Sequence, residues 1–323
     1  MRIFVAGATG AVGRRLVPLL VGHGHDVTGL TRTPAKAGLL RECGAEPVVA
    51  DALDEAAIHA AVAAARPDVI VHQLTDLKGA LDLRKFDRAF AGSNRLRTAG
   101  TDNLLAAARE SGVKRMIAQS FCGWPYAREG GSVKTEDAPL DDTPPRGQRD
   151  TLDAIRHLEQ AVTATPGITG VVLRYGGFYG PDTGVFDPTT IGEIRRRRMP
   201  VIGGGTAWWS FLHIDDAAEA TALAVERGEG IYNIVDDDPA PVHDWLDALA
   251  AMLGARRPLR IPAWLGRLAA GEPVVAMMTQ SRAGSNAKAR RALGWSPRHP
   301  SWRQGFAEII RNEARPAATM HTA

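Results

Sequence analysis

The chain has few cysteines and no long apolar runs, and both absences narrow the classes of protein to which it can belong. Its two cysteines, Cys43 and Cys122, lie far apart and lack the close spacing of metal ligands, so we expect no disulfide framework and a reducing compartment. The apolar stretches are much shorter than the roughly 20 residues that a membrane span needs. The apolar run after Met1 and Arg2 ends at Gly7, too early for a secretory signal. We therefore expect a cytoplasmic protein with no membrane partner.

A strong excess of one charge is also absent. The formal net charge is +3, which is too small to indicate a nucleic-acid partner. Hydrophobic residues make up 45% of the 323 residues, an ordinary fraction for a globular protein with a full core, and the length predicts two lobes. We expect the partner to be a small-molecule substrate.

Short apolar runs that end at glycine or polar residues alternate with helical spacings through the first half of the chain. This alternation predicts an α/β fold in which a Rossmann-type, doubly wound parallel sheet is followed by a smaller C-terminal substrate lobe. We place the dinucleotide-binding domain at 1–180 and the substrate lobe at 181–323. The six predicted strands are 3–6, 27–30, 47–50, 68–72, 115–119 and 170–174.

The turn after the first predicted strand carries three glycines and opens the first predicted helix. In this position, the first glycine permits a tight turn, the second lets the backbone approach a pyrophosphate, and the third lets helix and strand pack closely. The helix amino terminus would offer free N–H groups to the phosphates. The turn therefore predicts a dinucleotide site made by Gly7, Thr9, Gly10, Ala11, Val12 and Gly13.

The end of the second strand indicates the type of nucleotide. An acidic residue there would bind the ribose 2′-hydroxyl of NAD, but the chain has Thr31 and Arg32, with Lys36 nearby. A guanidinium suits a 2′-phosphate in charge and in geometry. We therefore predict NADP(H) in preference to NAD(H); the alternative is that this loop is simply basic and solvated.

Further cofactor contacts are expected where the third and fourth strands end. Asp51, followed by Ala52, would bind the adenine amino group or else cap the next helix, a role that Asp54 could also fill. Leu74 and Thr75 follow the fourth strand, beside the path of the cofactor.

Several segments, in this order, resemble the extended short-chain dehydrogenases/reductases of the NAD(P)-dependent epimerase/dehydratase group. The resemblance implies a Rossmann lobe with a C-terminal substrate lobe, Tyr175 and Gly176 at the nicotinamide end, and a homodimer. The segments are GATGAVG at 7–13, GTDNLLAAA at 100–108, LRYGGFYGP at 173–181, FLHIDDAAEA at 211–220, YNIVDD at 232–237 and NAKARRALGW at 286–295.

The resemblance breaks at the residues that normally carry the chemistry. The family uses a Ser or Thr after the fifth strand and a Tyr-x-x-x-Lys pair on the next helix, where the tyrosine is the acid or base and the lysine holds the nicotinamide ribose. No such pair exists in this chain; aligning Glu159 with the glutamate that often follows the family motif puts Thr151 and Ile155 in the two places. The serine position falls on Cys122 or on Ser120, and Ser120 is a further candidate cofactor contact.

Reduction of a carbonyl would still require a proton donor. Tyr126 is the first candidate because it follows the fifth strand, and Cys122 and Tyr179 come next. The alternatives are that Tyr126 is an ordinary rim residue and that Cys122 is a small buried hydrophobe.

Two other groups have competing interpretations. His213, Asp215 and Asp216 resemble metal ligands, but the family resemblance makes the two aspartates a helix start, and we predict no metal. Trp208 and Trp209 would either cover an apolar substrate or pack within the second lobe.

These observations predict an NADP(H)-dependent oxidoreductase that acts on a small organic substrate with a non-standard proton donor. An epimerase, dehydratase or isomerase that returns the hydride is the first alternative. A non-catalytic NADP(H)-binding sensor is the second, because the acid pair is missing.

Overall fold

A seven-stranded parallel sheet forms the centre of the protein in the computed structural model, which describes residues 1–77, 82–181, 183 and 188–314. In the order β12-β7-β5-β4-β1-β2-β3, the first strand lies inside the sheet. The chain adds β2 and β3 on one side of it and the later strands on the other side. The strands are β1 (Arg2–Ala6), β2 (Asp26–Thr31), β3 (Glu46–Val49), β4 (Val69–His72), β5 (Arg115–Phe121), β7 (Thr169–Tyr175) and β12 (Gly230–Ile234).

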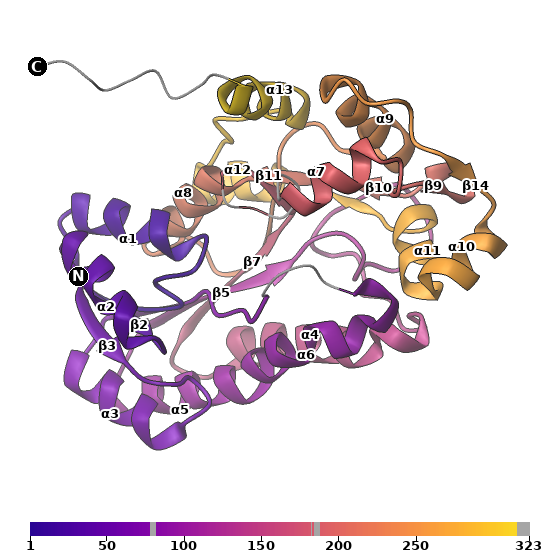
Figure 1. The fold of residues 1–323 in the computed structure, drawn as a ribbon. Helices are drawn as coiled ribbons and strands as arrows, with labels where there is room; N and C mark the ends of the chain where they lie inside the picture. The colour runs from indigo at the N-terminus through magenta and orange to yellow at the C-terminus, as the bar shows by residue number, and fades with distance from the viewer. Residues whose placement is uncertain (78–81, 182, 184–187, 315–323) are drawn as a thin grey trace, which may run out of the picture.

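Helices cover both faces of this sheet (Figure 1). On one face α1 (Gly13–Gly22) packs against α8 (Ile214–Ala224), with α2 (Ala37–Glu42) and α12 (Ala287–Leu293) contributing to the same core. On the other face lie α3 (Glu55–Ala65), α4 (Phe86–Arg95), α5 (Thr101–Glu110) and α6 (Arg149–Ala164). Because both faces are covered, the inner strands are apolar throughout, as in β4, where all four residues are buried.

A second core lies beyond the carboxyl edge of the sheet and is rich in aromatic rings. Phe211 contacts Trp245, Trp302 and Phe306, all of them buried. The helices of this lobe are α7 (Pro188–Arg195), α9 (Val242–Met252), α10 (Ala263–Ala270), α11 (Glu272–Thr279) and α13 (Trp302–Ala314). Its two-stranded pairs use β6 (Val133–Lys134), β8 (Gly177–Tyr179), β9 (Val201–Ile202), β10 (Trp208–Trp209), β11 (Phe211–His213), β13 (Ala240–Pro241), β14 (Arg260–Ile261) and β15 (Ala283–Gly284).

The predicted fold class is confirmed, and the six predicted strands match β1, β2, β3, β4, β5 and β7 to within two residues at each end. The seventh strand was not predicted: β12 pairs in parallel with β7. The domain boundary at residue 180 stays a prediction. The segments of β12 and α8 lie in the layers of the first lobe, although they follow that boundary.

The segment before α5 was also missed by the sequence analysis. It forms the helix α4 and then a π-helical turn, η3 (Leu96–Gly100), that runs directly into α5. Short 3₁₀ turns lie at η1 (Pro34–Lys36), η2 (Leu83–Lys85), η4 (Arg146–Gln148) and η6 (Gly203–Gly205). In the described ranges, none of the helices is both long and apolar enough to cross a membrane.

Asp236 joins the end of β12 to the second lobe. Its Oδ2 accepts a hydrogen bond from the backbone N–H of Trp302 at 2.8 Å, and the carboxyl group is almost completely buried. Burial raises the pKa of Asp236 from 3.8 to about 8, because a charged carboxylate is poorly solvated there. Near neutral pH, this carboxyl is therefore protonated in the folded state.

This shift gives the first testable prediction. Between about pH 4 and pH 8 the unfolded chain loses the Asp236 proton and the folded chain keeps it, so stability falls as the pH rises. Asp236→Asn keeps a carbonyl acceptor for Trp302 and cannot ionise. We expect the variant to lose about 1–3 kcal/mol of this pH dependence, measured by urea unfolding at several pH values.

Asp137→Asn is the matched control, because Asp137 is exposed and its substitution should leave the slope as in the parent protein. An equally steep slope in Asp236→Asn would contradict the assignment.

Candidate functional site

The turn between β1 and α1 approaches its neighbours closely, backbone to backbone. Gly7 has φ of +91°, and a Cβ atom there would lie 2.5 Å from the carbonyl oxygen of Gln73. A Cβ on Gly13 would lie 2.3 Å from the carbonyl oxygen of Gly7. Only glycine fits at either place, and the turn is thereby held against the end of β4.

The amino terminus of α1 is open to an anion. Val12 occupies the cap position, no side chain caps the helix, and the first turn carries no acidic residue. The first N–H groups of a helix have no intrahelical acceptor, and they carry the positive end of the helix dipole. The predicted residues from Gly7 to Gly13 therefore form a cradle that fits a diphosphate.

The end of β2 lies beside this cradle. The hydroxyl of Thr31 is 3.3 Å from that of Thr9, which ties the two segments together. Arg32 is partly exposed, and its guanidinium donates to Oδ1 of Asp76 at 2.7 Å. The ion pair holds the arginine at the edge of the site without burying its charge.

The other predicted cofactor contacts lie at the same edge of the sheet. Oδ1 of Asp51 accepts from the N–H of Leu53, and the separate cap of α3 is Asp54, so Asp51 does not serve as that cap. Its adenine contact stays a prediction. Ala52 is buried, Leu74 is half-buried and Thr75 is exposed.

Tyr175 points into the core between the sheet and α8. Its hydroxyl accepts from Nε2 of Gln73 at 3.0 Å and lies 2.6 Å from the hydroxyl of Thr221. The role of Tyr175 and Gly176 at the nicotinamide end stays a prediction. The tyrosine hydroxyl itself is hydrogen-bonded within the protein core. The buried Oε1 of Gln73 has no hydrogen-bond partner among the described residues.

A buried ion pair pins α6 to the sheet below the expected reaction centre. Arg174 donates to both carboxylate oxygens of Glu159, at 2.8 and 2.6 Å. Ser120 donates to the same carboxylate at 2.7 Å. The hydroxyl of Tyr126 donates to Oδ1 of Asn233 at 2.6 Å and accepts from Arg174 at 3.1 Å. Ser120, a predicted cofactor contact, is thus bonded inside this network.

The structure buries all three predicted proton donors. Tyr126 is 1% exposed, and burial raises its pKa far above the ordinary value. Burial raises the pKa of Cys122 to about 12, so the thiol stays protonated. Tyr179 lies in the second core against Phe306, and burial raises its pKa as well. Their catalytic roles stay predictions, and this burial weighs against each of them.

The two places of the missing acid pair lie on α6, and both side chains are buried. The hydroxyl of Thr151 donates to Oδ1 of Asp87 at 2.7 Å and accepts from Nδ2 of Asn94 at 3.0 Å. Ile155 lies one helical turn further on. The hydroxyl proton of Thr151 is held by a carboxylate, so this position does not offer an acid.

Three polar residues around this position were missed by the sequence analysis: Asp87, Asn94 and Arg97. They lie on α4 and η3, for which no element was predicted. One available signal was the run of polar residues directly before the GTDNLLAAA segment.

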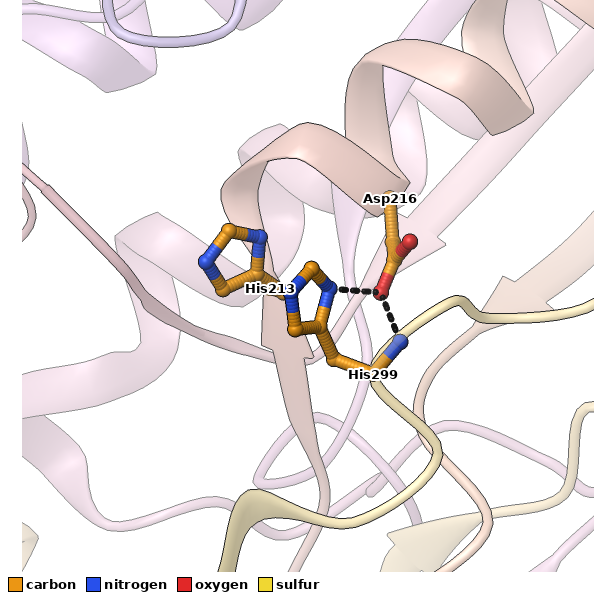
Figure 2. Close-up of side chains that lie close together, drawn as sticks. All are labelled: His213, Asp216 and His299. Carbon is orange, nitrogen blue, oxygen red and sulfur yellow. Dashed lines mark hydrogen bonds and ion pairs between the residues drawn. The ribbon is translucent and has the colours of Figure 1, made fainter. Parts of the chain in front are cut away.

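His213, Asp216 and His299 gather between α8 and the C-terminal segment (Figure 2). Both oxygens of Asp216 are engaged, Oδ1 by the N–H of Arg298 and Oδ2 by the N–H and Nδ1 of His299. The two imidazoles stack with ring centroids 3.7 Å apart, and Nδ1 of His213 accepts from the N–H of Asp215. These bonds describe an anchor for the C-terminal segment. As predicted, Asp215 and Asp216 lie in the first turn of a helix, α8.

For Trp209, the structure distinguishes between covering a substrate and packing within the second lobe. Trp209 donates from its indole to the carbonyl of Met277 and lies against Trp245. It therefore packs within the second lobe.

An open parallel sheet, a glycine turn and an uncapped helix amino terminus together define a Rossmann-type dinucleotide-binding protein. The chain belongs to the NAD dependent epimerase/dehydratase family, whose model matches residues 3–235. It is therefore an NAD(P)-dependent oxidoreductase of that family, and the resemblance seen in the sequence is confirmed.

Two curated relatives match nearly their full lengths. A 3-diazoavenalumate denitrifying reductase of a Streptomyces species is 44% identical over 95% of this chain and 99% of its own. A 4-hydroxy-2-methyl-3-oxo-4-farnesyl-3,4-dihydroquinoline-1-oxide ketoreductase of Stigmatella aurantiaca is 30% identical over 92% of each chain. A human epimerase family protein, solved with NADPH, shares the fold with a TM-score of 0.75, 22% identity, and coverage of 97% of this chain and 100% of its own.

The described residues fit the nicotinamide dinucleotide that the family implies. The cradle that a Cβ would fill at Gly7 and Gly13 suits a diphosphate. The unpartnered Oε1 of Gln73 is a buried polar atom at the end of β4, the strand end against which this turn is held.

Tyr126→Phe tests whether the first predicted proton donor is structural. The change removes a buried hydroxyl bonded to Asn233 and Arg174. We expect a loss of about 1–3 kcal/mol in unfolding free energy, with turnover and cofactor affinity changed less than about twofold, from urea unfolding and steady-state kinetics.

Tyr179→Phe is the control, because the Tyr179 hydroxyl is buried without a hydrogen-bond partner in the described part of the chain. It should cost little or no stability. A large fall in kcat for Tyr126→Phe at unchanged stability would instead establish Tyr126 as the acid.

Proposed function

We propose that this protein is an NADPH-dependent reductase that removes the diazo group from an organic diazo compound. The substrate class comes from the relative with 44% identity, whose name describes reductive denitrification of 3-diazoavenalumate. The observation that carries the reaction class is Thr151, which lies at the acid position with its proton bonded to Asp87.

The chemistry explains why such a site can lack a proton donor. Hydride addition to a carbonyl leaves an alkoxide, which needs an acid. A diazonium group, R–N≡N⁺, is positively charged, and hydride addition to its terminal nitrogen gives the neutral diazene R–N=N–H. Loss of N₂ then leaves R–H, so atoms and charge balance without a protein acid. The reduced cofactor supplies the hydride.

Aromatic side chains beside Thr151 support a substrate with a planar ring. Phe86, the residue before Asp87, stacks on Phe90 with ring centroids 4.5 Å apart and meets Trp124 edge-on at 5.2 Å. Trp124 is half-buried in the segment after β5. Phe86 itself is buried, so the half-buried rings of Phe90 and Trp124 are the ones available to a flat aromatic ligand, by stacking and by edge contacts.

NADPH is proposed over NADH because of Arg32. Its partly exposed guanidinium lies where β2 ends, the place that reads the adenosine ribose. In Arg32→Ala we expect NADPH to bind about 10- to 100-fold more weakly, with NADH affinity within about threefold of the parent protein, both by calorimetry.

Lys36→Ala is the matched control, since Lys36 is exposed in the same loop. It should change neither affinity by more than about twofold. Equal weakening of NADPH and NADH in Arg32→Ala would remove the basis for NADP selectivity.

A matched pair of substrates tests the reaction. We expect the protein with NADPH to convert 4-carboxybenzenediazonium to benzoate, with one N₂ released per NADPH oxidised, well above the enzyme-free rate. The kcat/KM should exceed that for 4-acetylbenzoate by about 100-fold or more. Ketone reduction without accelerated denitrification would favour a ketoreductase, the activity named for the relative with 30% identity.

Thr151→Val tests whether denitrification depends on a proton from the acid position. It removes the hydroxyl while keeping the shape, and because denitrification needs no proton from this residue, kcat should change less than about threefold.

The protein is also proposed to act in the cytoplasm as a homodimer. The family resemblance implies the dimer, and the paucity of cysteine favours a reducing compartment. Sedimentation of the purified protein tests the dimer.

A further inference from the structure

The π-helical turn η3 presents a buried arginine towards the site. The turn spans Leu96–Gly100 and connects α4 directly to α5. Such turns are rare and frequently lie at functional sites, because the extra residue re-aims the side chains around it. Arg97 is the charged residue that this turn carries inwards, with 9% of its surface exposed.

The Arg97 guanidinium has few partners for so buried a charge. The described residues give it one hydrogen bond, from an Nη atom to Oδ1 of Asn94 at 3.4 Å. Glu159, the neighbouring carboxylate, is already bonded by Arg174 and Ser120. Burial lowers the pKa of Arg97 to about 10, and Glu159 only partly offsets this. A guanidinium has five N–H donors, and this single hydrogen bond engages only one of those of Arg97.

The arginine lies between the end of β4 and the helix that would normally carry the catalytic lysine. Burial lowers the pKa of His72, the last residue of β4, and the positive charge of Arg97 lowers it further. On its other side, Asn94 bridges Arg97 and Thr151 by hydrogen bonds to both. The turn η3 packs against α6, where Ile155 occupies the lysine place. Arg97 is therefore next to the position that the missing ammonium group would fill.

We propose that Arg97 replaces the missing lysine and binds the hydroxyl oxygens of the nicotinamide-side ribose of the cofactor. A lysine at 155 would reach that ribose from α6, and Arg97 reaches the same place from the adjacent turn. The ribose hydroxyls supply acceptor oxygens to donors that the protein leaves unmet. Arg97 is thus a cofactor-binding residue. The proposal rests on the part of the proposed function that concerns the nicotinamide dinucleotide.

Calorimetry with two nucleotides tests this assignment. The ligand 2′,5′-ADP represents the adenosine half of NADPH and lacks the nicotinamide ribose. In Arg97→Leu, we expect NADPH affinity to fall about 10-fold or more and 2′,5′-ADP affinity to stay within about twofold. Arg97→Lys should retain most of the NADPH affinity, since an ammonium also donates to hydroxyl oxygens. Adding Ile155→Lys to Arg97→Leu should restore part of the loss.

Arg95→Leu is the matched control, because Arg95 is exposed two residues earlier and should leave both affinities unchanged. Unchanged NADPH affinity in Arg97→Leu would overturn the proposal. A rise in KM for a carboxylate-bearing substrate would not rescue it, because Arg97 would then bind the substrate and not the cofactor. Equal weakening of both nucleotides would overturn it too, because Arg97 would then support the cradle in general. If the parent protein binds NADPH but does not reduce the diazonium probe, the proposed reaction fails while the role of Arg97 stands.

Discussion

The backbone contact between the β1–α1 turn and the end of β4 determines where the rest of the site can lie. Gly7 approaches the carbonyl of Gln73 so closely that a methyl group would not fit between them. Because no side chain separates the turn from the sheet, the open amides of α1 face the carboxyl edge of β4 directly. The parallel register then brings the ends of β5 and β7 alongside, and a dinucleotide lying on this edge meets the residues after each strand in turn.

The ion pair between Glu159 and Arg174 imposes a second constraint, because a buried pair must keep all its hydrogen bonds to be tolerated. Ser120 and Tyr126 supply the remaining bonds. Residues that resemble a catalytic serine and tyrosine are thereby drawn beneath the sheet edge. The hydroxyl groups of Ser120 and Tyr126 are therefore part of the scaffold.

The sequence predicted the features that depend on local patterns. Buried parallel strands are continuous apolar runs, so six of them were located, and the glycine turn was identified by its place between a strand and a helix. The burial of the candidate donors could not be predicted from the sequence, because it depends on partners that are distant in the chain. Tyr126 and its partner Asn233 are 107 residues apart. The π-helical turn interrupts the 3.6-residue periodicity between α4 and α5, so its inward-facing Arg97 could not be predicted from helical spacing, and α4, with Asp87 and Asn94, was missed as well. The strand β12 was missed because its sequence, GIYNI, includes Asn233 and lacks the continuous apolar run of the inner strands.

The proposed reaction suits a site that lacks the family's usual acid. At the acid position, the Thr151 hydroxyl is bound to Asp87, and Tyr126 and the thiol of Cys122 are buried, which raises the pKa of each. Carbonyl reduction would then be limited by protonation of the alkoxide. An electrophile that carries its own positive charge avoids this step, since hydride alone neutralises it and the escape of N₂ makes the reaction irreversible. Under the proposed function, the loss of the Tyr-x-x-x-Lys pair favours a substrate whose reduction needs no acid.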